Sequence, residues 1–355
     1  MTLWTLDLTD FRCIQSAELE LDPHCTLIVG DNGSGKSSLL EAVHVLSCGR
    51  SFRTSHSELL VRAHQPGFLI RGAVTRNGGR TLLGVKGFAG RVEPHFDGRK
   101  SAGFAELARA LPVQVIDPHV HQLVDGGPKE RRRFLDWGVF HVEPRFVGAW
   151  RRFQTALRQR NAALKARSDS GVVRSWDEEF CAAGSLVAAF RKAYLEDLQE
   201  HVGLIANALL GLPVTLSFRQ GWDETVTLDT ALVNSWARDA ALGQTSIGPH
   251  RADVVISVDD SIARERVSRG QQKLLASAAI LGQLVHQAAH GLGPAVLLFD
   301  DPAAELDVEN LKRLLTVIVQ IPAQLMVTAL DDRSFEGLSG GKKFHVKQGR
   351  VDGML

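Results

Sequence analysis

The sequence has 355 residues, of which 44% are hydrophobic and 23% are charged, and its formal net charge is only +1. A chain of this length and composition forms one large or two medium globular domains, which excludes a mostly disordered protein. We find no basic and apolar leader and no run near the roughly 18 apolar residues of a membrane span, so we expect a cytoplasmic protein without membrane contact. The four cysteines lack C-x-x-C spacing, and we interpret them as reduced residues that bind no metal.

Alternating apolar and polar residues in the first third of the chain predict an antiparallel meander and a final buried strand. We expect strands over residues 4–8, 17–21, 68–75, 80–88, 93–96 and 112–116, and a short helix over 105–110. The apolar run Leu27-Ile28-Val29 predicts the end of a further strand, and residues 36–47 follow it as a helix. Residues 1–124 are therefore predicted to form the first part of an α/β domain.

The middle of the chain changes to long helical patterns that lack sustained heptads, which indicates a compact helical lobe over residues 125–244. We expect helices over 129–139, 145–167, 176–210 and 229–242, and a strand over 214–218. From about Thr245 the strand patterns return, so residues 245–355 are predicted to complete the sheet domain. They contain expected strands over 254–258, 295–299 and 324–329, and expected helices over 264–287 and 308–319.

The segment Gly30-Asp31-Asn32-Gly33-Ser34-Gly35-Lys36-Ser37 matches the phosphate-binding pattern G-x-x-x-x-G-K-[ST] between a strand and a helix. Its glycines allow the backbone to wrap a phosphate, and the first N–H groups of the helix face the anion. We expect Lys36 to reach the β- and γ-phosphates and Ser37 to bind Mg²⁺, with Ser38 next to the bound nucleotide. Arg12 lies at the tip of the preceding predicted hairpin, so we expect it near the nucleotide.

A second motif is the apolar strand Ala295-Val296-Leu297-Leu298-Phe299, which ends in Asp300 and Asp301. An apolar strand followed by carboxylates is often only a core strand that leaves the interior. After a phosphate loop, however, this arrangement is typical of the Mg²⁺ site of a nucleotide hydrolase. We therefore predict that Asp300 binds the metal ion with Ser37 and that Asp301 polarises the attacking water.

The segment from Asp125 to Arg167 carries eleven basic residues against four acidic ones, a local excess of seven positive charges. Such a segment suits phosphate backbones without sequence preference, although it also fits a solvated helix face. The candidate DNA contacts are Arg131, Arg132, Arg133, Arg158, Arg160 and Lys165.

The segment Val267-Ser268-Arg269-Gly270-Gln271-Gln272-Lys273 opens a predicted helix and resembles the signature motif of ABC-type ATPases. In that family, residues such as Ser268, Gly270 and Gln271 contact the γ-phosphate held by the other subunit. The same residues also fit a capping box, so a plain helix cap remains an alternative. Glu305-Leu306-Asp307 resembles the D-loop of this family, and Thr328 closes the last strand where the family carries its switch residue. We find no clear Q-loop glutamine after Ile116, and Asp117 is the candidate for that role.

About two hundred residues separate the phosphate loop from the signature motif, as in the SMC and Rad50 branch of the family. Four further segments resemble the bacterial RecF family of recombinational-repair ATPases. These segments are Gly126-Gly127-Pro128-Lys129-Glu130-Arg131-Arg132-Arg133-Phe134-Leu135-Asp136-Trp137, Arg158-Gln159-Arg160-Asn161-Ala162-Ala163-Leu164-Lys165, Gly248-Pro249-His250-Arg251 and Asp300-Asp301. The resemblance implies an ABC-type head of α/β class, a mixed sheet with an antiparallel meander and an inserted helical lobe.

The resemblance also implies a DNA-stimulated ATPase that uses ATP and Mg²⁺, dimerises on ATP and binds DNA at single-strand gaps. RecO and RecR are the partners that it implies, with slow hydrolysis resetting the dimer during recombinase loading. Two alternatives remain at this point: a P-loop kinase of small molecules, and a scaffold in which ATP is only structural. A kinase would leave the Ser268 motif unexplained, and a scaffold would hydrolyse nothing.

Overall fold

The computed structural model describes the chain except for residues 77, 89, 305, 332–334, 336–340 and 355. It divides into two compact units. The first contains residues 1–120 and 291–355 and is called the head here; the second contains residues 121–290 and is called the helical unit. The head thus contains residues from both ends of the chain, and its boundaries differ from the predicted ones at residues 124 and 245.

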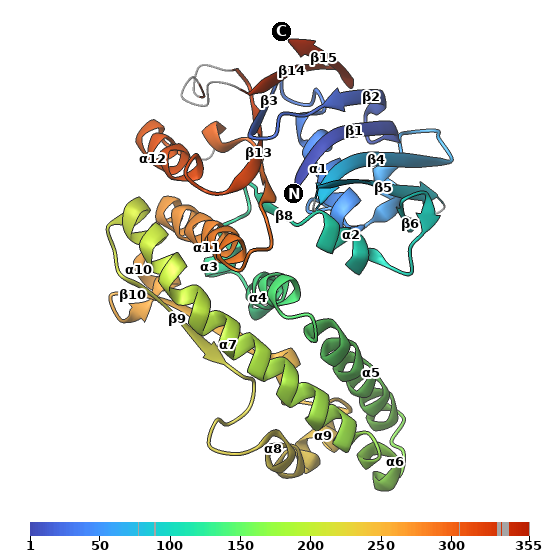
Figure 1. The fold of residues 1–355 in the computed structure, drawn as a ribbon. Coiled ribbons are helices and arrows are strands. Elements are labelled where there is room, and N and C mark those ends of the chain that lie inside the picture. Colours follow the sequence, from blue (N-terminus) through green and yellow to red (C-terminus); the bar gives the residue numbers. More distant parts are fainter. Residues whose placement is uncertain (77, 89, 305, 332–334, 336–340, 355) are drawn as a thin grey trace. The chain divides into compact units, whose positions relative to one another are not determined.

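The amino-terminal part of the head forms a six-stranded antiparallel sheet in the order β2-β1-β4-β5-β6-β7 (Figure 1). Its strands are β1 Thr2–Phe11, β2 Ile14–Glu20, β4 Gly67–Arg76, β5 Gly79–Phe88, β6 Arg91–Phe96 and β7 Arg99–Lys100. The alternation of buried and exposed residues along β1 and β2 agrees with one face packed on the core and one face in water. Each expected strand of the meander is present; all begin earlier than predicted, and β2 ends one residue before the predicted end at residue 21.

The second sheet of the head has the order β15-β14-β3-β13-β12-β8, and its neighbouring strands are parallel except for the pair β14 and β15. Its strands are β3 Cys25–Val29, β8 Val113–Ile116, β12 Ala295–Phe299, β13 Ala323–Ala329, β14 Lys342–Lys347 and β15 Arg350–Met354. The helical elements of the head are α1 Lys36–Cys48, η1 Ser57–Leu60, α2 Phe104–Ala110, η3 Pro302–Ala304 and α12 Val308–Ile318. Because β3, β13, β12 and β8 are parallel, their carboxyl ends meet at one edge of the sheet.

Helix α1 joins the core of the head through Leu39, Leu40, Val43 and Leu46, which are fully buried. It approaches the antiparallel sheet closely at Gly72, where an added Cβ would lie 2.6 Å from Leu46 Cδ2. A side chain at this position would have to displace the ends of the Leu46 and Leu3 side chains, so glycine allows α1 to pack closely on the sheet.

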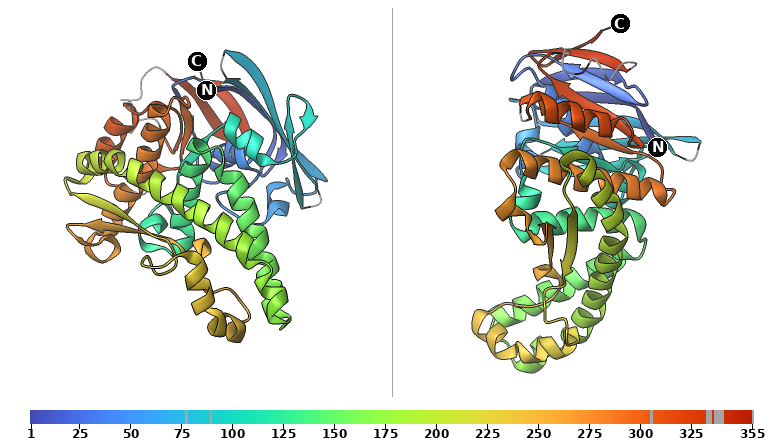
Figure 2. Two further views of the ribbon diagram at one scale, coloured as in Figure 1. Left: turned by 60° about the horizontal axis from the view of Figure 1, so that its bottom comes forward. Right: turned by 90° about the vertical axis from the view of Figure 1, so that its left-hand side faces the viewer.

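The helical unit is organised on one long helix, α7, which buries apolar residues such as Phe180 and Leu198 along its length. Helices α5 and α7 lie side by side, and α11 packs on α7 as well (Figure 2). The helices are α3 Gln122–Asp125, α4 Pro128–Val142, α5 Phe146–Lys165, α6 Ser170–Arg174, α7 Asp177–Leu210, α8 Leu228–Asn234, α9 Trp236–Leu242, η2 Pro249–Arg251, α10 Ala263–Arg266 and α11 Arg269–Ala289. A three-stranded sheet in the order β11-β10-β9 completes the unit, with β9 Val214–Arg219, β10 Asp253–Val258 and β11 Ser261–Ile262.

Three expectations about this unit need correction. The helix expected over 264–287 is divided into α10 and α11, because Val267 leaves the helical conformation and Ser268 caps a new helix. Residues 245–290 do not resume the sheet of the head, because β10 pairs with β9 and β11 within the helical unit. The helix expected over 229–242 is two helices that meet at Ser235, whose hydroxyl donates to Leu232 O at 3.0 Å and to Asp239 Oδ2 at 3.3 Å. A serine that bonds locally in this way competes with the helical backbone pattern.

The guanidinium of Arg160 is completely buried in the helical unit. It donates to Asp177 Oδ1 at 2.8 Å, to Asp239 Oδ2 at 2.9 Å and to Thr245 Oγ1 at 2.8 Å. Asp239 is also fully buried, and a buried ion is tolerated only with such partners. These contacts tie α5 to the start of α7, to α9 and to the segment after α9.

We predict that Arg160→Gln lowers the free energy of unfolding by about 3–5 kcal/mol, because it leaves the buried Asp239 carboxylate without its cation. Arg158→Gln is the matched control, since Arg158 is exposed on the same helix and its loss should cost under about 0.5 kcal/mol. Urea unfolding followed by circular dichroism measures both variants. Equal stability of the two variants would contradict a structural role for the Arg160 network.

Candidate functional site

The phosphate loop joins β3 to α1 in the head, and three of its glycines adopt positive φ angles: 154° at Gly30, 75° at Gly33 and 118° at Gly35. Residues with a Cβ rarely adopt these angles. At Gly30 a side chain is also sterically excluded, because an added Cβ would lie 2.2 Å from Val346 O. The loop conformation therefore depends on glycine at the positions that the sequence motif names.

The Lys36 side chain is almost fully buried, with 6% of its surface exposed. Its Nζ donates to Gly30 O at 2.6 Å and to Asp31 O at 2.9 Å, so the ammonium lies inside the loop. Burial lowers the pKa of Lys36, and the nearby carboxylates of Asp301 and Asp300 oppose that shift. A cation enclosed by a glycine-rich loop is positioned to bind a polyphosphate.

The carboxylate of Asp300 joins the phosphate loop to the sheet. Its Oδ1 accepts hydrogen bonds from Ser37 Oγ and from Thr328 Oγ1, each at 2.8 Å. Ser37 is the second residue of α1, Asp300 follows β12 and Thr328 lies near the end of β13. The structure thus brings together three residues that the sequence predicts separately, and their hydroxyl and carboxylate oxygens are ligands that Mg²⁺ prefers.

Asp301 has a left-handed backbone conformation with φ of 47°, which is uncommon for a residue other than glycine. Its N–H donates to Thr328 Oγ1 at 2.8 Å, so Thr328 connects both aspartates. Strained conformations of this kind cluster at functional sites. Asp117 lies at the same edge, because β8 pairs with β12 in register Ile116 to Phe299 and Asp300 N donates to Ile116 O.

The residues of the loop fit a bound triphosphate with a divalent cation. Ser34 Oγ is buried and has no hydrogen-bond partner among the described residues. The first N–H groups of α1 likewise lack acceptors within the helix. Together with Lys36 and the oxygens of Ser37 and Asp300, these groups form a donor set for phosphate next to a ligand set for a hard cation.

The guanidinium of Arg12 binds a carboxylate of helix α1. It contacts the fully buried Glu41 carboxylate with two bonds, 2.8 Å to Oε2 and 2.5 Å to Oε1, and donates to Leu59 O at 2.9 Å. Its neighbour Cys13 approaches the loop, since its Sγ would lie 3.0 Å from a Cβ at Gly35. Arg12 therefore anchors the hairpin beside the phosphate loop, and its contact with the nucleotide stays a prediction.

Ser268 is the N-cap of α11 and forms a capping box. Its Oγ accepts from Gln271 N at 3.4 Å, and its own N–H donates to Gln271 Oε1 at 2.9 Å. The alternative that the sequence left open is thus present in the structure, and Ser268 is also exposed. Asp307 caps α12 in the head by accepting from Asn310 N at 2.8 Å, whereas Glu305 lies outside the described residues.

The structure corrects the list of candidate DNA contacts in the helical unit. Arg131 is buried and pairs with Asp253 at 2.7 Å, and Arg160 is buried as described above. Arg132 donates to Ala252 O at 2.7 Å, so its guanidinium serves the fold as well. The candidates that remain exposed are Arg133, Arg158 and Lys165.

Sequence reasoning missed the support that the end of the chain gives the phosphate loop. The turn between β14 and β15 lies against the loop, where Gly349 N donates to Ser34 O at 2.8 Å. Alternation over Phe344 to Lys347 followed by Gln348-Gly349 could have predicted this hairpin. No local signal could have shown that it contacts the loop.

The chain matches the model of the RecF/RecN/SMC N terminal domain over residues 2–351. It is 38% identical to the DNA replication and repair protein RecF of Azotobacter vinelandii, over 99% of this chain and 98% of that protein. The protein of that name from Shewanella baltica is 37% identical over 99% of both chains. Among the described residues no helix is both long and apolar enough to cross a membrane.

Solved structures agree with this relationship. The recombination mediator protein RecF-ATPrS in the RecFOR pathway gives a TM-score of 0.89 at 25% identity, over 99% of this chain and 98% of that one. The RecF-ATP structure gives a TM-score of 0.90 at 24% identity, over 100% and 98% of the chains. An Smc head bound to the C-winged helix domain of ScpA gives a lower TM-score of 0.59 at 17% identity, over 100% and 97%.

These matches confirm the expected α/β ABC-type head with its mixed sheet, antiparallel meander and inserted helical segment. They also confirm the resemblance that the phosphate loop, the signature-like segment and the paired aspartates suggest. The chain therefore belongs to the RecF family, within the wider family defined by the RecF/RecN/SMC N-terminal domain.

Proposed function

We propose that this chain is an ATP-dependent DNA-binding switch of recombinational repair, which binds ATP with Mg²⁺, dimerises and is reset by slow hydrolysis. The observation that carries the proposal is the Asp300 carboxylate, which accepts from Ser37 and Thr328 at 2.8 Å each. It joins the end of the phosphate loop to the acidic end of β12, as a nucleotide hydrolase requires. The relatives are described as DNA replication and repair proteins, and a solved structure is described as the recombination mediator protein RecF-ATP in the RecFOR pathway.

Each group at the loop has a separate task in this proposal. Lys36 binds the β- and γ-phosphates by exchanging its present carbonyl acceptors, Gly30 and Asp31, for phosphate oxygens. Ser37 and Asp300 would hold Mg²⁺, which would supply positive charge next to the phosphate oxygens. Buried Ser34 Oγ and the N–H groups at the start of α1 complete the donors to phosphate.

Asp301 is the proposed base that orients and polarises the attacking water. Its backbone is held by the Thr328 hydroxyl, which also bonds Asp300, so the two carboxylates keep a fixed relation. Thr328 is therefore suited to the switch role, because a displacement of Asp300 would alter the hydrogen bond between the Thr328 hydroxyl and Asp301 N. Asp117, at the end of β8, is the proposed Q-loop residue.

Dimerisation is proposed to complete the site, with Ser268, Gly270 and Gln271 of one subunit binding the γ-phosphate held by the other. Ser268 is exposed, so its hydroxyl is accessible to a phosphate held by another subunit. Asp307 in the D-loop segment is likewise exposed at the start of α12 and is proposed to lie at the same interface. Gapped DNA, RecO and RecR are the proposed partners.

We predict that two variants in the head both lose hydrolysis but differ in ATP binding and dimerisation. Lys36→Met should lose ATP binding, ATP-dependent dimerisation and hydrolysis, because the phosphate charge is uncompensated. Asp301→Asn should keep ATP and the dimer while hydrolysis falls about 10²–10⁴-fold, since asparagine tolerates the left-handed backbone but is no base. ATP turnover with and without gapped DNA, and sedimentation with ATP, ADP or no nucleotide, measure these effects.

Normal turnover by Lys36→Met would exclude the assigned nucleotide site. Loss of ATP binding by Asp301→Asn would show that the roles of the two aspartates are exchanged. A wild-type protein that binds ATP but turns over nothing, with or without DNA, would support a scaffold. Turnover that needs a small phosphoryl acceptor would support a kinase.

For the composite site we predict that Ser268→Arg and Asp301→Asn are each nearly inactive, whereas a mixture regains activity. A mixed dimer has one site with both defects and one with neither, so random pairing gives at most about a quarter of wild-type turnover. Mixing Asp301→Asn with Asp301→Ala is the matched control, because it leaves no intact site. The measurement is ATP turnover, with mixed dimers detected by capture of a tag on one variant.

If captured mixed dimers remain inactive, or if Ser268→Arg alone hydrolyses ATP normally, Ser268 is only a helix cap. The ABC-type mechanism would then lose its main support in this chain.

For DNA binding we predict that the triple variant Arg133→Gln, Arg158→Gln, Lys165→Gln makes the decrease of log affinity with log salt concentration less steep. The magnitude of the slope should decrease by about 0.9 for each phosphate of duplex DNA that the variant no longer neutralises. The control removes three exposed positive charges from the head: Arg80→Gln, Lys86→Gln, Arg91→Gln. Fluorescence anisotropy at several salt concentrations gives both slopes. A changed slope in the control and an unchanged slope in the helical-unit variant would move the DNA surface to the antiparallel sheet.

A further inference from the structure

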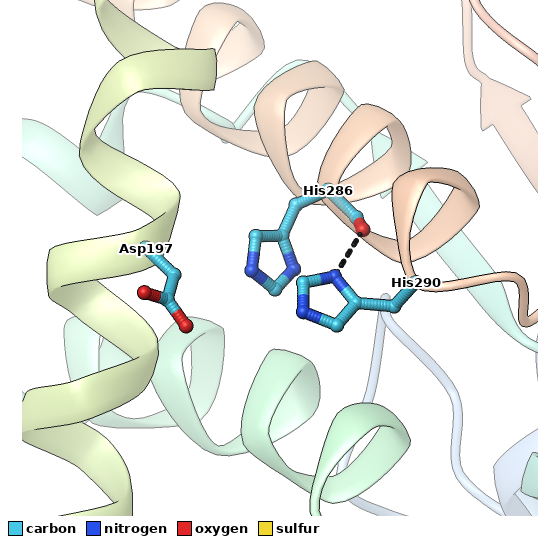
Figure 3. A group of neighbouring side chains, drawn as sticks. All are labelled: Asp197, His286 and His290. Carbon is cyan, nitrogen blue, oxygen red and sulfur yellow. Dashed lines mark hydrogen bonds between the residues drawn. The ribbon is translucent and has the colours of Figure 1, made fainter.

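Helices α7 and α11 of the helical unit face each other with metal-ligating residues one helical turn apart on each helix. Asp197 and His201 lie on α7, and His286 lies near the end of α11 with His290 as its C-cap. Residues four positions apart share one face of a helix, so each pair points in one direction. Figure 3 shows the Asp197 carboxylate and the imidazoles of His286 and His290 turned toward one another.

The distances in this cluster suit a single ion. One ligand atom each from Asp197, His286 and His290 lies within 4.8 Å of the others. Bonds of 2.0–2.1 Å in a tetrahedral site place ligand atoms about 3.3 Å apart, which small side-chain rotations would reach. His290 Nδ1 bonds His286 O at 2.9 Å and must donate to that carbonyl, which leaves Nε2 with a lone pair for a metal.

His286 gives an independent indication of a ligand. Its side chain is about 1% exposed, and neither Nδ1 nor Nε2 has a hydrogen-bond partner among the described residues. Burial of a polar group without a partner is unfavourable, so the ring nitrogens of His286 are expected to have a bound ligand.

We propose that Asp197, His286 and His290 bind one divalent transition-metal ion of the Zn²⁺ type. Two imidazoles and one carboxylate are borderline ligands, which favour Zn²⁺ over the hard ions Mg²⁺ and Ca²⁺. Three protein ligands would leave a coordination position for water. The ring of His201 lies 5.6 Å from that of His286. The ion would cross-link α7 to α11, the helix that Ser268 caps.

The test uses the full, untagged chain, freed of metal with EDTA and kept without nucleotide. Calorimetry with Zn²⁺ should show one ion per chain, and Co²⁺ should give the visible absorption of a site with nitrogen ligands. Asp197→Asn and His290→Ala should each lower Zn²⁺ affinity by more than about 10–100-fold, the loss typical of outer-shell partners. Both residues are exposed, so these changes should preserve the fold, as circular dichroism can verify.

Two controls match these variants. Glu196→Gln removes an exposed charge next to Asp197 on the same helix, and His56→Ala removes an exposed histidine of the head. Both should bind Zn²⁺ as the wild type does, and Zn²⁺ should raise the melting temperature of the controls but not of Asp197→Asn. No binding by the wild type at micromolar Zn²⁺, or unchanged affinity in Asp197→Asn and His290→Ala, would overturn the proposal.

Discussion

The nucleotide site of this protein depends on one carboxylate oxygen, Asp300 Oδ1, which accepts from Ser37 and Thr328. The Asp300 N–H also donates to Ile116 O, so this residue connects α1, β13 and β8 with its own strand. The parallel order of the strands makes these contacts possible, because it places their carboxyl ends at one edge. The phosphate loop and the acidic strand are distant in sequence, and the sheet brings them together.

Local patterns were enough to predict most strands and helices and the residues around the phosphate loop. Glycine positions, apolar runs and terminal carboxylates act over a few residues, so the sequence displays them directly. The assignment of residues 245–290 to the sheet of the head was wrong because strand pairing depends on contacts between residues that are distant in sequence. The alternation in β10 identifies a strand, but its partners β9 and β11 are fixed by packing that the pattern does not encode.

The exposure of charged residues in the helical unit also could not be predicted from local sequence patterns. Arg158 and Arg160 are two positions apart on one helix, yet one is exposed and the other is enclosed by Asp177 and Asp239. Their environments depend on residues that follow in later helices, so a count of basic residues overestimates the free positive surface. Five of the eleven basic residues in the segment are paired with carboxylates: Arg131, Arg133, Arg145, Arg152 and Arg160.

The capping box at Ser268 bears on how one residue could serve two structures at once. A hydroxyl group carries one hydrogen and two lone pairs, and the bond from Gln271 N uses only a lone pair. The hydrogen therefore stays available to an incoming anion while α11 remains capped. The Ser268 hydroxyl can thus cap α11 as an acceptor and bind a phosphate oxygen as a donor at the same time, so the capping box does not exclude phosphate binding.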